Sequence, residues 1–512
     1  MTWLVPLPVV IPLIAAGLAL AMSRRSRAQG IISVVALSLV LLTAVVLIFL
    51  THHQGPQVVN IGGWGAPVGI ALVADRLSAL MLLISAIVIL CVLLYSLAQG
   101  LADGNEGAPV AIYHPTYLVL AAGVANAFLS GDLFNLYVGF EILLAASFVL
   151  LTLGGTGERI RAGSIYVVVS LLSSILFLIA IALIYAATGT LNLAQLSERL
   201  GDVDPAMRLV LQVMLLMGFS IKAAVFPLSA WLPDSYPTAP APVTAVFAGL
   251  LTKVGVYAII RTQTLLFTDG RLNTLLMWAA LLTMIVGIIG AVAQDDIKRL
   301  LSFTLVSHIG YMIFGISLAS TTGLSASIFY VAHHITVQTA LFLVAGLIER
   351  RGGTTSLERL GSLAKVAPAL AVLFFVPAMN LAGIPPMSGF LGKTGLLQAG
   401  VELGTPLAYA AMGAGLLTSL LTLYAVVKAW NKAFWQDAPE PLPDTSIPRS
   451  MFGPAAVLAS VGIAIAVIGG PLYAYTGAAA RDLRLQSPYI DAVLVHGERG
   501  AGQSSDASGD DS

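Results

Sequence analysis

Four ionisable residues lie inside otherwise apolar stretches of this chain. They are Glu141, Lys222, Lys253 and Lys393, each flanked by runs of aliphatic and aromatic residues. An ionisable group at membrane depth is costly, so such residues usually mark a substrate, ion or proton pathway. A single lysine near a helix end could instead extend its side chain to the interface. Three lysines and a glutamate together are harder to explain in that way, and we interpret them as one functional set.

Amines in an apolar interior can exchange protons. Burial of an amine favours its neutral form, whereas a nearby carboxylate restores the ammonium form. A lysine whose carboxylate partner approaches and withdraws can therefore take up and release a proton. The sequence suggests Glu141 as the partner of Lys222, and a cation that arrived near Glu141 would then displace the lysine electrostatically.

Histidines in two further apolar segments could pass protons between these charges. His308 lies in LVSHIGYM, and His333 and His334 lie in YVAHHITVQTALFLVAG. An imidazole titrates near neutral pH and carries a proton on either nitrogen, although a histidine in a helix bundle can also serve only as a hydrogen-bond link. Asp234, in a turn, is either a helix cap or a carboxylate that takes up protons.

Two of the lysines lie beside helix-breaking residues. Lys222 precedes Pro227, and Lys393 follows Pro385 and Pro386. A proline removes a backbone donor, and broken helices persist in a bilayer only where they face protein or a water-filled cavity. Broken spans at matching positions of two halves indicate a transport site. The alternative is a plain proline kink in each helix.

The amino-acid composition indicates whether these residues lie in a soluble protein or in a membrane protein. Of the 512 residues 58% are hydrophobic and 10% are charged, against about 25% charged in a soluble domain. The 25 basic and 25 acidic residues balance, which argues against nucleic-acid binding and disorder. Cys91 is the one cysteine, so neither a disulfide framework nor a cysteine metal cluster is expected. No nucleotide, dinucleotide or haem motif is present, and we expect no enzyme activity, cofactor or metal site.

The apolar runs predict an all-α polytopic membrane protein with about fourteen spans of roughly twenty residues. The predicted spans are 3–22, 30–50, 73–98, 112–130, 133–153, 163–187, 208–230, 242–262, 273–293, 300–319, 326–348, 367–402, 407–430 and 452–474. The twelfth is too long for one straight helix, so we interpret it as a broken helix. The first lacks the leading positive charge of a signal peptide and is expected to be retained.

The broken spans suggest how the chain is divided. If spans 4–8 and 9–13 form two five-helix inverted repeats, the broken helices 7 and 12 are both fourth in their repeats. The predicted units are N-terminal helices 1–3 (1–110), the first repeat (111–265), the second repeat (266–435), helix 14 (436–475) and a polar tail (476–512) with a disordered end.

Loop charges set the expected orientation. The loops after odd-numbered spans carry 14 Lys and Arg residues, against 8 on the other side. Because cytoplasmic loops are rich in Lys and Arg, we place the loops after odd-numbered spans in the cytoplasm and both termini outside. Arg261 is counted here among the outer loop residues.

Several long segments resemble a known membrane family. They are WLPDSYPTAPAPVTAVFAGLLTKVGVYAIIR (231–261), QDDIKRLLSFTLVSHIGYM (294–312) and GIPPMSGFLGKTGLL (383–397). With the fourteen-span layout, they are similar to the antiporter-like subunits of respiratory complex I, membrane-bound hydrogenases and Mrp-type cation/proton antiporters. The segment GDLFNLYVGFEILLAASFVLL (131–151) most resembles the D-subunit family of Mrp-type Na⁺/H⁺ antiporters.

The resemblance implies roles for individual residues. Those expected to form a hydrophilic axis for proton translocation at the bilayer centre are Glu141, Lys222, Lys253, His334 and Lys393. His308, His333 and Gln338 are possible relay residues. Many relatives carry a lysine where this chain has Gln338, and glutamine can bridge waters but cannot exchange a proton near neutral pH. A relay through that helix would then depend on His334 or on water.

The resemblance also implies function and partners. We expect a proton-translocating subunit of a multisubunit Na⁺/H⁺ antiporter in the cell membrane, assembled with other Mrp-type subunits. The competing hypothesis is a proton-pumping subunit of complex I or a membrane-bound hydrogenase, which would use the same residues. A purely structural membrane subunit is the third possibility. No dense carboxylate cluster is visible in the spans, so Na⁺ is expected to pass through a partner or a shared interface.

Overall fold

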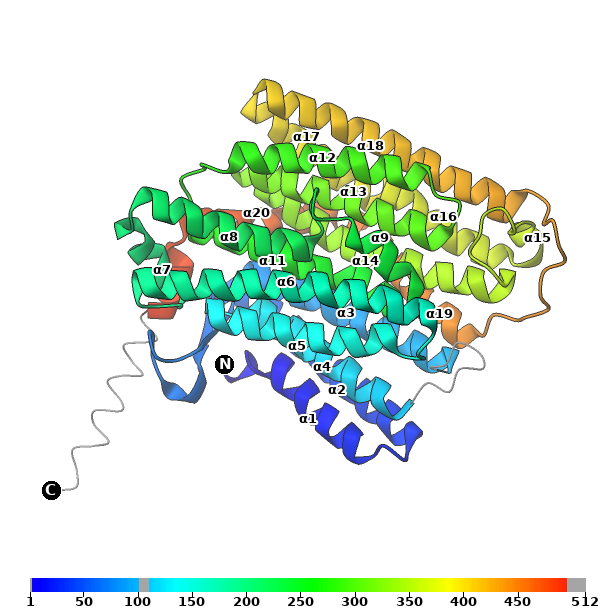
Figure 1. Cartoon of the computed structure of the whole chain (residues 1–512), viewed down its shortest axis with the longest axis horizontal. Helices are drawn as coiled ribbons and strands as arrows, with labels where there is room; N and C mark the ends of the chain where they lie inside the picture. The colour runs from blue at the N-terminus through cyan, green and yellow to red at the C-terminus, as the bar shows by residue number, and fades with distance from the viewer. Residues whose placement is uncertain (1, 101–109, 495–512) are drawn as a thin grey trace.

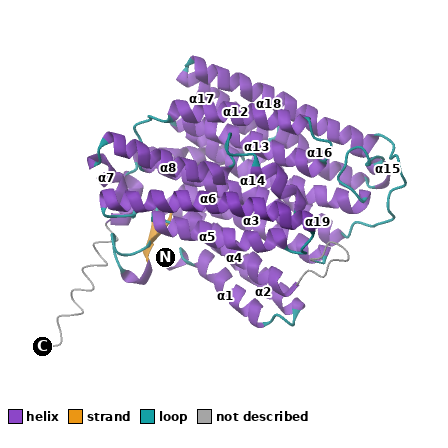
Figure 2. Ribbon diagram, in the orientation of Figure 1, coloured by secondary structure: helices purple, strands orange, loops and turns teal. Residues whose placement is uncertain are grey.

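The computed structural model describes residues 2–100 and 110–494. Almost all of this part is helical, because a helix satisfies its own backbone hydrogen bonds in a medium without water. The helices lie side by side along the long axis of the molecule (Figure 1), and the one sheet among the described residues is a two-stranded hairpin (Figure 2).

The first half of the chain contains these elements: α1 (Leu7–Ala21), α2 (Ser26–Gln54), β1 (Gln57–Asn60), β2 (Ala71–Ala74), α3 (Arg76–Gln99), α4 (Val110–Leu129), α5 (Leu133–Thr152), α6 (Gly157–Thr188), α7 (Leu193–Arg199), α8 (Pro205–Ala223), α9 (Trp231–Ser235), α10 (Ala241–Val246), the π-helix η5 (Phe247–Leu251) and α11 (Thr252–Leu265). The short 3₁₀ turns are η1 (Thr2–Leu4), η2 (Ile61–Gly63), η3 (Leu200–Asp202) and η4 (Tyr236–Thr238).

The second half contains α12 (Asn273–Val292), α13 (Ile297–Ser317), α14 (Thr321–Gly352), α15 (Leu363–Val366), α16 (Pro368–Ala382), α17 (Ser388–Leu403), α18 (Pro406–Trp430), the π-helix η6 (Asn431–Trp435), α19 (Arg449–Val467) and α20 (Gly469–Leu485). The predicted tail, 476–512, begins inside α20, which packs on α3, α11 and α14. Residues 495–512 lie outside the described residues.

The prediction of an all-helical membrane protein is confirmed. Among the described residues, twelve helices are long and apolar enough to cross a membrane. The predicted first and twelfth spans correspond to shorter apolar helices, the 15-residue α1 and the 15-residue α16 that precedes α17. Helix length alone therefore does not establish fourteen crossings, and that count stays a prediction.

Side-chain caps explain where many helices begin. A short polar side chain accepts a hydrogen bond from a backbone N–H that the first turn leaves unpaired. Asp75 caps α3 in a reciprocal arrangement with Ser78, and Asp132 caps α5. The other capping residues are Thr156, Asn192, Asp204, Asp296, Ser320 and Thr405.

The two halves repeat the same local structure. Asp132 before α5 and Asp296 before α13 are both caps, and α6 and α14 both have 32 residues. Leu133 N donates to Leu191 O and Leu193 N to Gly131 O; in the second half Ile297 N donates to Thr355 O and Leu357 N to Asp295 O. The corresponding pairs are separated by the same number of residues in each half. They support the proposed repeats 111–265 and 266–435.

The matching segments of the two halves lie at opposite ends of the molecule. Asp132 lies at the end of the molecule that holds the β-hairpin and α7, whereas Asp296 lies at the end that holds α15 (Figure 1). We name these the outer and inner ends, following the predicted orientation. The loops after odd-numbered predicted spans meet at the inner end, where Arg159 contacts Thr238 O and Arg299 contacts Asp234.

Candidate functional site

Lys222 lies in the last turn of α8, immediately before the break. Its Nζ donates to Ser170 O and to Ser174 Oγ on α6, both at 3.4 Å. The break follows because Ala224 is left-handed (φ 57°), and helical structure resumes only at α9. Phe226 N donates to Thr283 Oγ1 at 3.0 Å, so one backbone donor at the break is satisfied by a side chain of α12. The predicted break at Pro227 is therefore present.

Glu141 lies on α5, which packs against α6. Its Oε1 is buried and makes no hydrogen bond to protein. No ion pair within 4.0 Å joins Glu141 and Lys222 among the described residues. The Glu141 carboxylate nevertheless acts electrostatically on the Lys222 amine, so their partnership stays a prediction. The Lys222 amine lies beside α6, where the Ser174 hydroxyl is within its reach.

Lys253 is fully buried at the start of α11, directly after a distorted stretch of helix. The five residues of η5 form a π-helix, and a π-helix shifts the backbone hydrogen-bond pattern by one residue. The Lys253 Nζ donates to Ala248 O, within η5, at 2.7 Å. An ammonium has three donors, so further donor capacity remains beside Thr252, whose Oγ1 is buried without a protein partner.

The adjoining face of α14 carries unpaired polar groups. Both ring nitrogens of His334 are buried without a protein hydrogen bond, as is the Gln338 Oε1. The Gln338 Nε2 donates to Leu301 O at 2.7 Å. The η5 segment approaches this face closely, since a Cβ at Gly249 would lie 2.2 Å from Thr339 Oγ1. Buried polar groups without protein partners are usually satisfied by water.

His308 connects three helices by hydrogen bonds. Its Nδ1 is 2.8 Å from the Tyr330 hydroxyl and its Nε2 is 3.2 Å from Thr422 Oγ1. The ring centroids of His308 and His334 are 5.4 Å apart. His333 lies on the other side of Tyr330 and bonds Ser388 Oγ through Nδ1 at 2.9 Å. His308 is thus more central to the polar chain than its sequence context indicates.

Lys393 lies on α17 beside the second break. Its Nζ donates to Leu381 O at 3.1 Å and to Ala382 O at 2.9 Å. These are carbonyls at the C-terminal end of α16, where unpaired acceptors and the helix dipole favour a cation. The ammonium also lies 5.0 Å from the centre of the Tyr311 ring. Gly383, at φ 87°, ends α16 before the predicted prolines, Pro385 and Pro386.

Asn380 holds the two parts of this broken helix together. Its Oδ1 accepts from Gly389 N at 2.9 Å and from Ser388 Oγ at 3.1 Å. Ser388 Oγ also contacts Gly462 O at 3.1 Å and His333. The backbone at the start of α17 is therefore tied to α16, α14 and α19. Asn380 was not predicted from the sequence, although it is the one polar residue in VPAMNLAG.

Adding a methyl group at Gly389 is expected to force this break apart. A Cβ there would lie 2.1 Å from Asn380 O, which is backbone and cannot rotate away, and 3.1 Å from the His333 ring. Gly389→Ala should therefore destabilise the protein by about 1–3 kcal/mol, as overpacking does, in thermal denaturation of the purified complex. The matched control is Gly413→Ala in α18, where the Cβ meets nothing within 4 Å; equal stability of the two variants would contradict the packing described.

Asp234 lies at the inner end and is not a helix cap. Its carboxylate pairs with Arg299 at 3.1 Å and is largely exposed. It lines a polar cleft between the two repeats, together with Glu158, Arg159, Lys298 and Glu349. Lys298 and Glu349 pair at 2.6 Å. An exposed carboxylate in a polar cleft can collect protons, so of the two possibilities raised for Asp234 the capping role is wrong.

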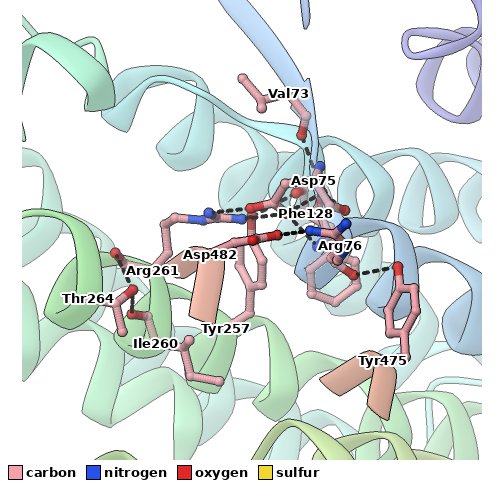
Figure 3. A network of polar contacts seen from close by, with 11 residues as sticks. Val73, Asp75, Arg76, Phe128, Tyr257, Ile260, Arg261, Thr264, Tyr475 and Asp482 are labelled. Carbon is pink, nitrogen blue, oxygen red and sulfur yellow. Dashed lines mark hydrogen bonds and ion pairs between the residues drawn. The ribbon is translucent and has the colours of Figure 1, made fainter. Parts of the chain in front are cut away.

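A buried ion pair between Arg261 and Asp75 was not predicted. Arg261, counted from the sequence as an outer loop residue, lies in α11 with 2% of its side chain exposed and pairs with Asp75 at 2.6 Å (Figure 3). Burial raises the pKa of the Asp75 carboxyl, but the Arg261 guanidinium and the hydrogen bonds from Ser78 together lower it below its ordinary value. A pairing between residues so distant in sequence leaves no local signal in either segment. Because Arg261 is not a loop residue, the excess of loop Lys and Arg residues at the inner end over the outer end is larger than the sequence count.

Together the fold and these residues define a class. A polytopic helical membrane protein with two broken helices and buried ionisable groups between them has the interior of an ion-translocating protein.

Residues 130–422 match the family described as NADH:quinone oxidoreductase/Mrp antiporter, transmembrane. The chain is 39% identical over 497 residues to the D subunit of a Na⁺/H⁺ antiporter of Alkalihalophilus pseudofirmus, covering 96% of this chain and 99% of the relative. Among solved structures it is similar to a chain of the Mrp complex from Dietzia sp. (TM-score 0.89, 33% identity, 96% of this chain and 100% of that one). It is also similar to a chain of an archaeal membrane-bound sulfane sulfur reductase (TM-score 0.87, 27% identity, 96% and 100%). The chain belongs to the NADH:quinone oxidoreductase/Mrp antiporter family.

Proposed function

We propose that this chain is the D-type, proton-translocating subunit of a multisubunit Na⁺/H⁺ antiporter in the cell membrane. It is part of a secondary transporter rather than an enzyme, and its partners are the other subunits of such a complex. Support comes from the similarity over nearly the whole chain to a protein named as the D subunit of a Na⁺/H⁺ antiporter and to a chain of a solved Mrp complex.

One observation carries the translocating role. Buried ionisable and polar groups follow one another from α5 and α8, through α11 and α14, to α17. Several of their polar atoms make no protein hydrogen bond, including Glu141 Oε1 and both nitrogens of His334. Such atoms in an apolar interior are stabilised by water. We therefore assign proton translocation to Glu141, Lys222, Lys253, His334 and Lys393, with water bridging the gaps.

The proposed sequence of steps begins at the inner cleft. Asp234 takes up a proton from the cytoplasm and passes it toward the break after Lys222. Movement of Glu141 toward or away from Lys222 changes whether the amine holds the proton, because a close carboxylate favours the charged amine. The hydroxyl of Ser174 on α6 lies beside the lysine and can link it to water. From Lys222 the proton moves to Lys253, across the contact of α8 with α11.

The second stage runs along α14. His334 accepts the proton near Lys253, and His308 continues the path through its hydrogen bond to Tyr330. Tyr330 lies between His308 and His333, whose ring centroid is 5.3 Å from that of Tyr330. His333 adjoins the break where Lys393 lies. Gln338 contributes an acceptor for water rather than a titrating group.

Na⁺ is assigned to a partner subunit or to an interface with one. Hard cations favour several oxygen ligands, mostly carboxylates and carbonyls. Among the described residues no group of three or more His, Cys, Asp or Glu side chains could hold a metal ion, and Glu141 is the one carboxylate among the five residues assigned to proton translocation. We therefore infer that the chain chiefly moves protons.

The alternative function is a proton pump driven by redox chemistry in other subunits. The similarity to the sulfane sulfur reductase chain supports it, but at 27% identity against 39% for the antiporter relative. An experiment on the reconstituted complex distinguishes the antiporter from the redox-driven pump. In vesicles with an imposed pH gradient and no reductant, the addition of Na⁺ alone should collapse the gradient. A gradient that does not respond to Na⁺ and forms only when a reductant is added would overturn the antiporter assignment.

A further inference from the structure

A polar stripe leads from the proposed axis toward the outer end of α11. Lys253, Tyr257 and Arg261 follow one another at four-residue spacing and so share one face of the helix. The helical rise places Arg261 about 12 Å from Lys253 along the axis. The Tyr257 hydroxyl donates to Phe128 O at 2.7 Å and accepts from Arg261 Nη2 at 3.2 Å. Without a block, such a stripe would be a route for protons from Lys253 to the outside.

Contacts with Asp75 and two tyrosine rings hold the Arg261 side chain within this stripe (Figure 3). Its two terminal nitrogens donate to the two Asp75 oxygens at 2.6 and 2.9 Å. The rings of Tyr257 and Tyr489 lie 5.4 and 4.9 Å from the guanidinium carbon. Asp75 is held in turn by Ser78 N at 2.9 Å.

Beyond Asp75 the network reaches the surface. Arg76 pairs with Asp482 on α20, and both side chains are partly exposed. Tyr475 donates to Arg76 O at 3.0 Å. The printed sequence of polar contacts therefore runs from Tyr257 through Arg261 and Asp75 to the surface pair at the outer end. Arg261 is its buried guanidinium, a group that donates hydrogen bonds and cannot accept them.

We propose that Arg261, held by Asp75, is the barrier that stops protons from escaping from Lys253 to the outer side through the first repeat. A proton wire requires groups that both accept and donate, whereas a guanidinium has only donors and stays protonated. Its fixed positive charge also repels an arriving proton, as an arginine does in other selective pores. Protons that reach Lys253 are thereby directed to His334 and the second repeat.

This inference rests on the proposed function, and leak measurements test it separately. The assembled complex is reconstituted in vesicles, and the decay of an imposed pH gradient is followed without Na⁺. Asp75→Asn with Arg261→Gln replaces the pair by neutral amides that can accept and donate. We expect a several-fold faster decay. Adding Lys253→Met should return the decay to the wild-type rate, which a merely loosened structure would not do.

Further variants separate the barrier from a structural role. Asp75→Leu with Arg261→Met removes the same ion pair but fills the site with apolar side chains. The pH gradient should then decay at the wild-type rate. Arg76→Gln with Asp482→Asn alters the partly exposed pair of the same network, and the pH gradient should again decay at the wild-type rate. Asp75→Ser with Arg261→Gln is a second polar replacement, expected to leak.

Three results would overturn the proposal. The first is an assembled polar variant that holds the gradient as wild type does. The second is a leak that persists after Lys253→Met. The third is that neither polar variant assembles while the apolar one does, since the pair would then serve packing alone. If wild type itself shows no Na⁺-driven proton movement, the proposed function fails, whatever the leak.

Discussion

Replacing Lys253 by methionine is expected to abolish Na⁺-driven proton movement while the complex still assembles. The Lys253 amine is fully buried, and it donates a hydrogen bond to Ala248 O. Loss of a positioned proton-transfer group typically lowers a rate by about a hundredfold or more. Methionine has a similar length and no charge to bury, so the stability should be unchanged or higher. Co-purification of partner subunits and dye-reported proton movement measure the two effects.

The matched control for Lys253 is Lys432, in η6 at the inner end. Its amine is partly exposed and lies 3.4 Å from Asp295. Lys432→Met should leave transport within about twofold of wild type, because a surface ion pair contributes little. Transport by the assembled Lys253→Met complex at the level of the Lys432→Met complex would remove Lys253 from the proton path.

Replacing Asp75 by alanine is expected to have the largest effect on stability. It leaves Arg261 charged, with 2% of its side chain exposed. Removing one partner of a buried ion pair typically costs about 3–5 kcal/mol. Because the pKa of Asp75 lies below its ordinary value of 3.8 in the folded protein, its stabilising contribution is present above that pH and is lost as the pH falls through and below it. Thermal denaturation of the purified complex at several pH values measures both.

A second aspartate at the outer end gives the comparison. Asp269 pairs with Arg208 at 2.6 Å and Arg271 at 3.1 Å, all partly exposed. Asp269→Ala should cost about 1 kcal/mol or less. If Asp75→Ala were no more destabilising than Asp269→Ala, the Asp75–Arg261 pair would not hold α3 and α11 together.

The parts of this fold that follow from local physics are those the sequence predicts. Long apolar runs require helices, and the helices lie where the runs do. Pro227, Pro385 and Pro386 mark helix breaks because a proline removes a backbone donor. The lysines stand out because a charge is costly in an apolar run. Their assignment as transport residues stays a prediction.

The parts that the sequence does not predict depend on contacts between distant segments. Arg261 has the sequence context of a loop residue near a span end, and Asp75 that of an ordinary cap; nothing in either stretch indicates the other. The positions of Asn380 and Tyr330 beside the second break likewise depend on how α14, α16 and α17 pack. The described ion pairs do not include Glu141 and Lys222. The sequence does not predict this, because composition does not fix how closely two helices bring their charges together.

The two proposed repeats show both what the sequence predicts and what it does not. The two halves are not visibly alike as sequences, because most of their residues face lipid or a neighbouring helix and any apolar residue suffices there. Equivalent backbone pairings survive at the helix starts, as between Asp132 and Asn192 and between Asp296 and Ser356. Spacing and capping residues therefore support the predicted repeat where side-chain identity does not.

The central claim is that protons driven by Na⁺ cross the membrane through the buried axis of this chain. The most direct test measures the Na⁺-induced collapse of a pH gradient in everted vesicles that contain the whole complex. Wild type is compared with Glu141→Gln and Lys222→Met, and with the surface controls Glu402→Gln and Lys432→Met. The account predicts collapse in wild type and both controls, and none in the two axis variants although their complexes assemble. Collapse at the wild-type rate in an assembled axis variant would contradict it.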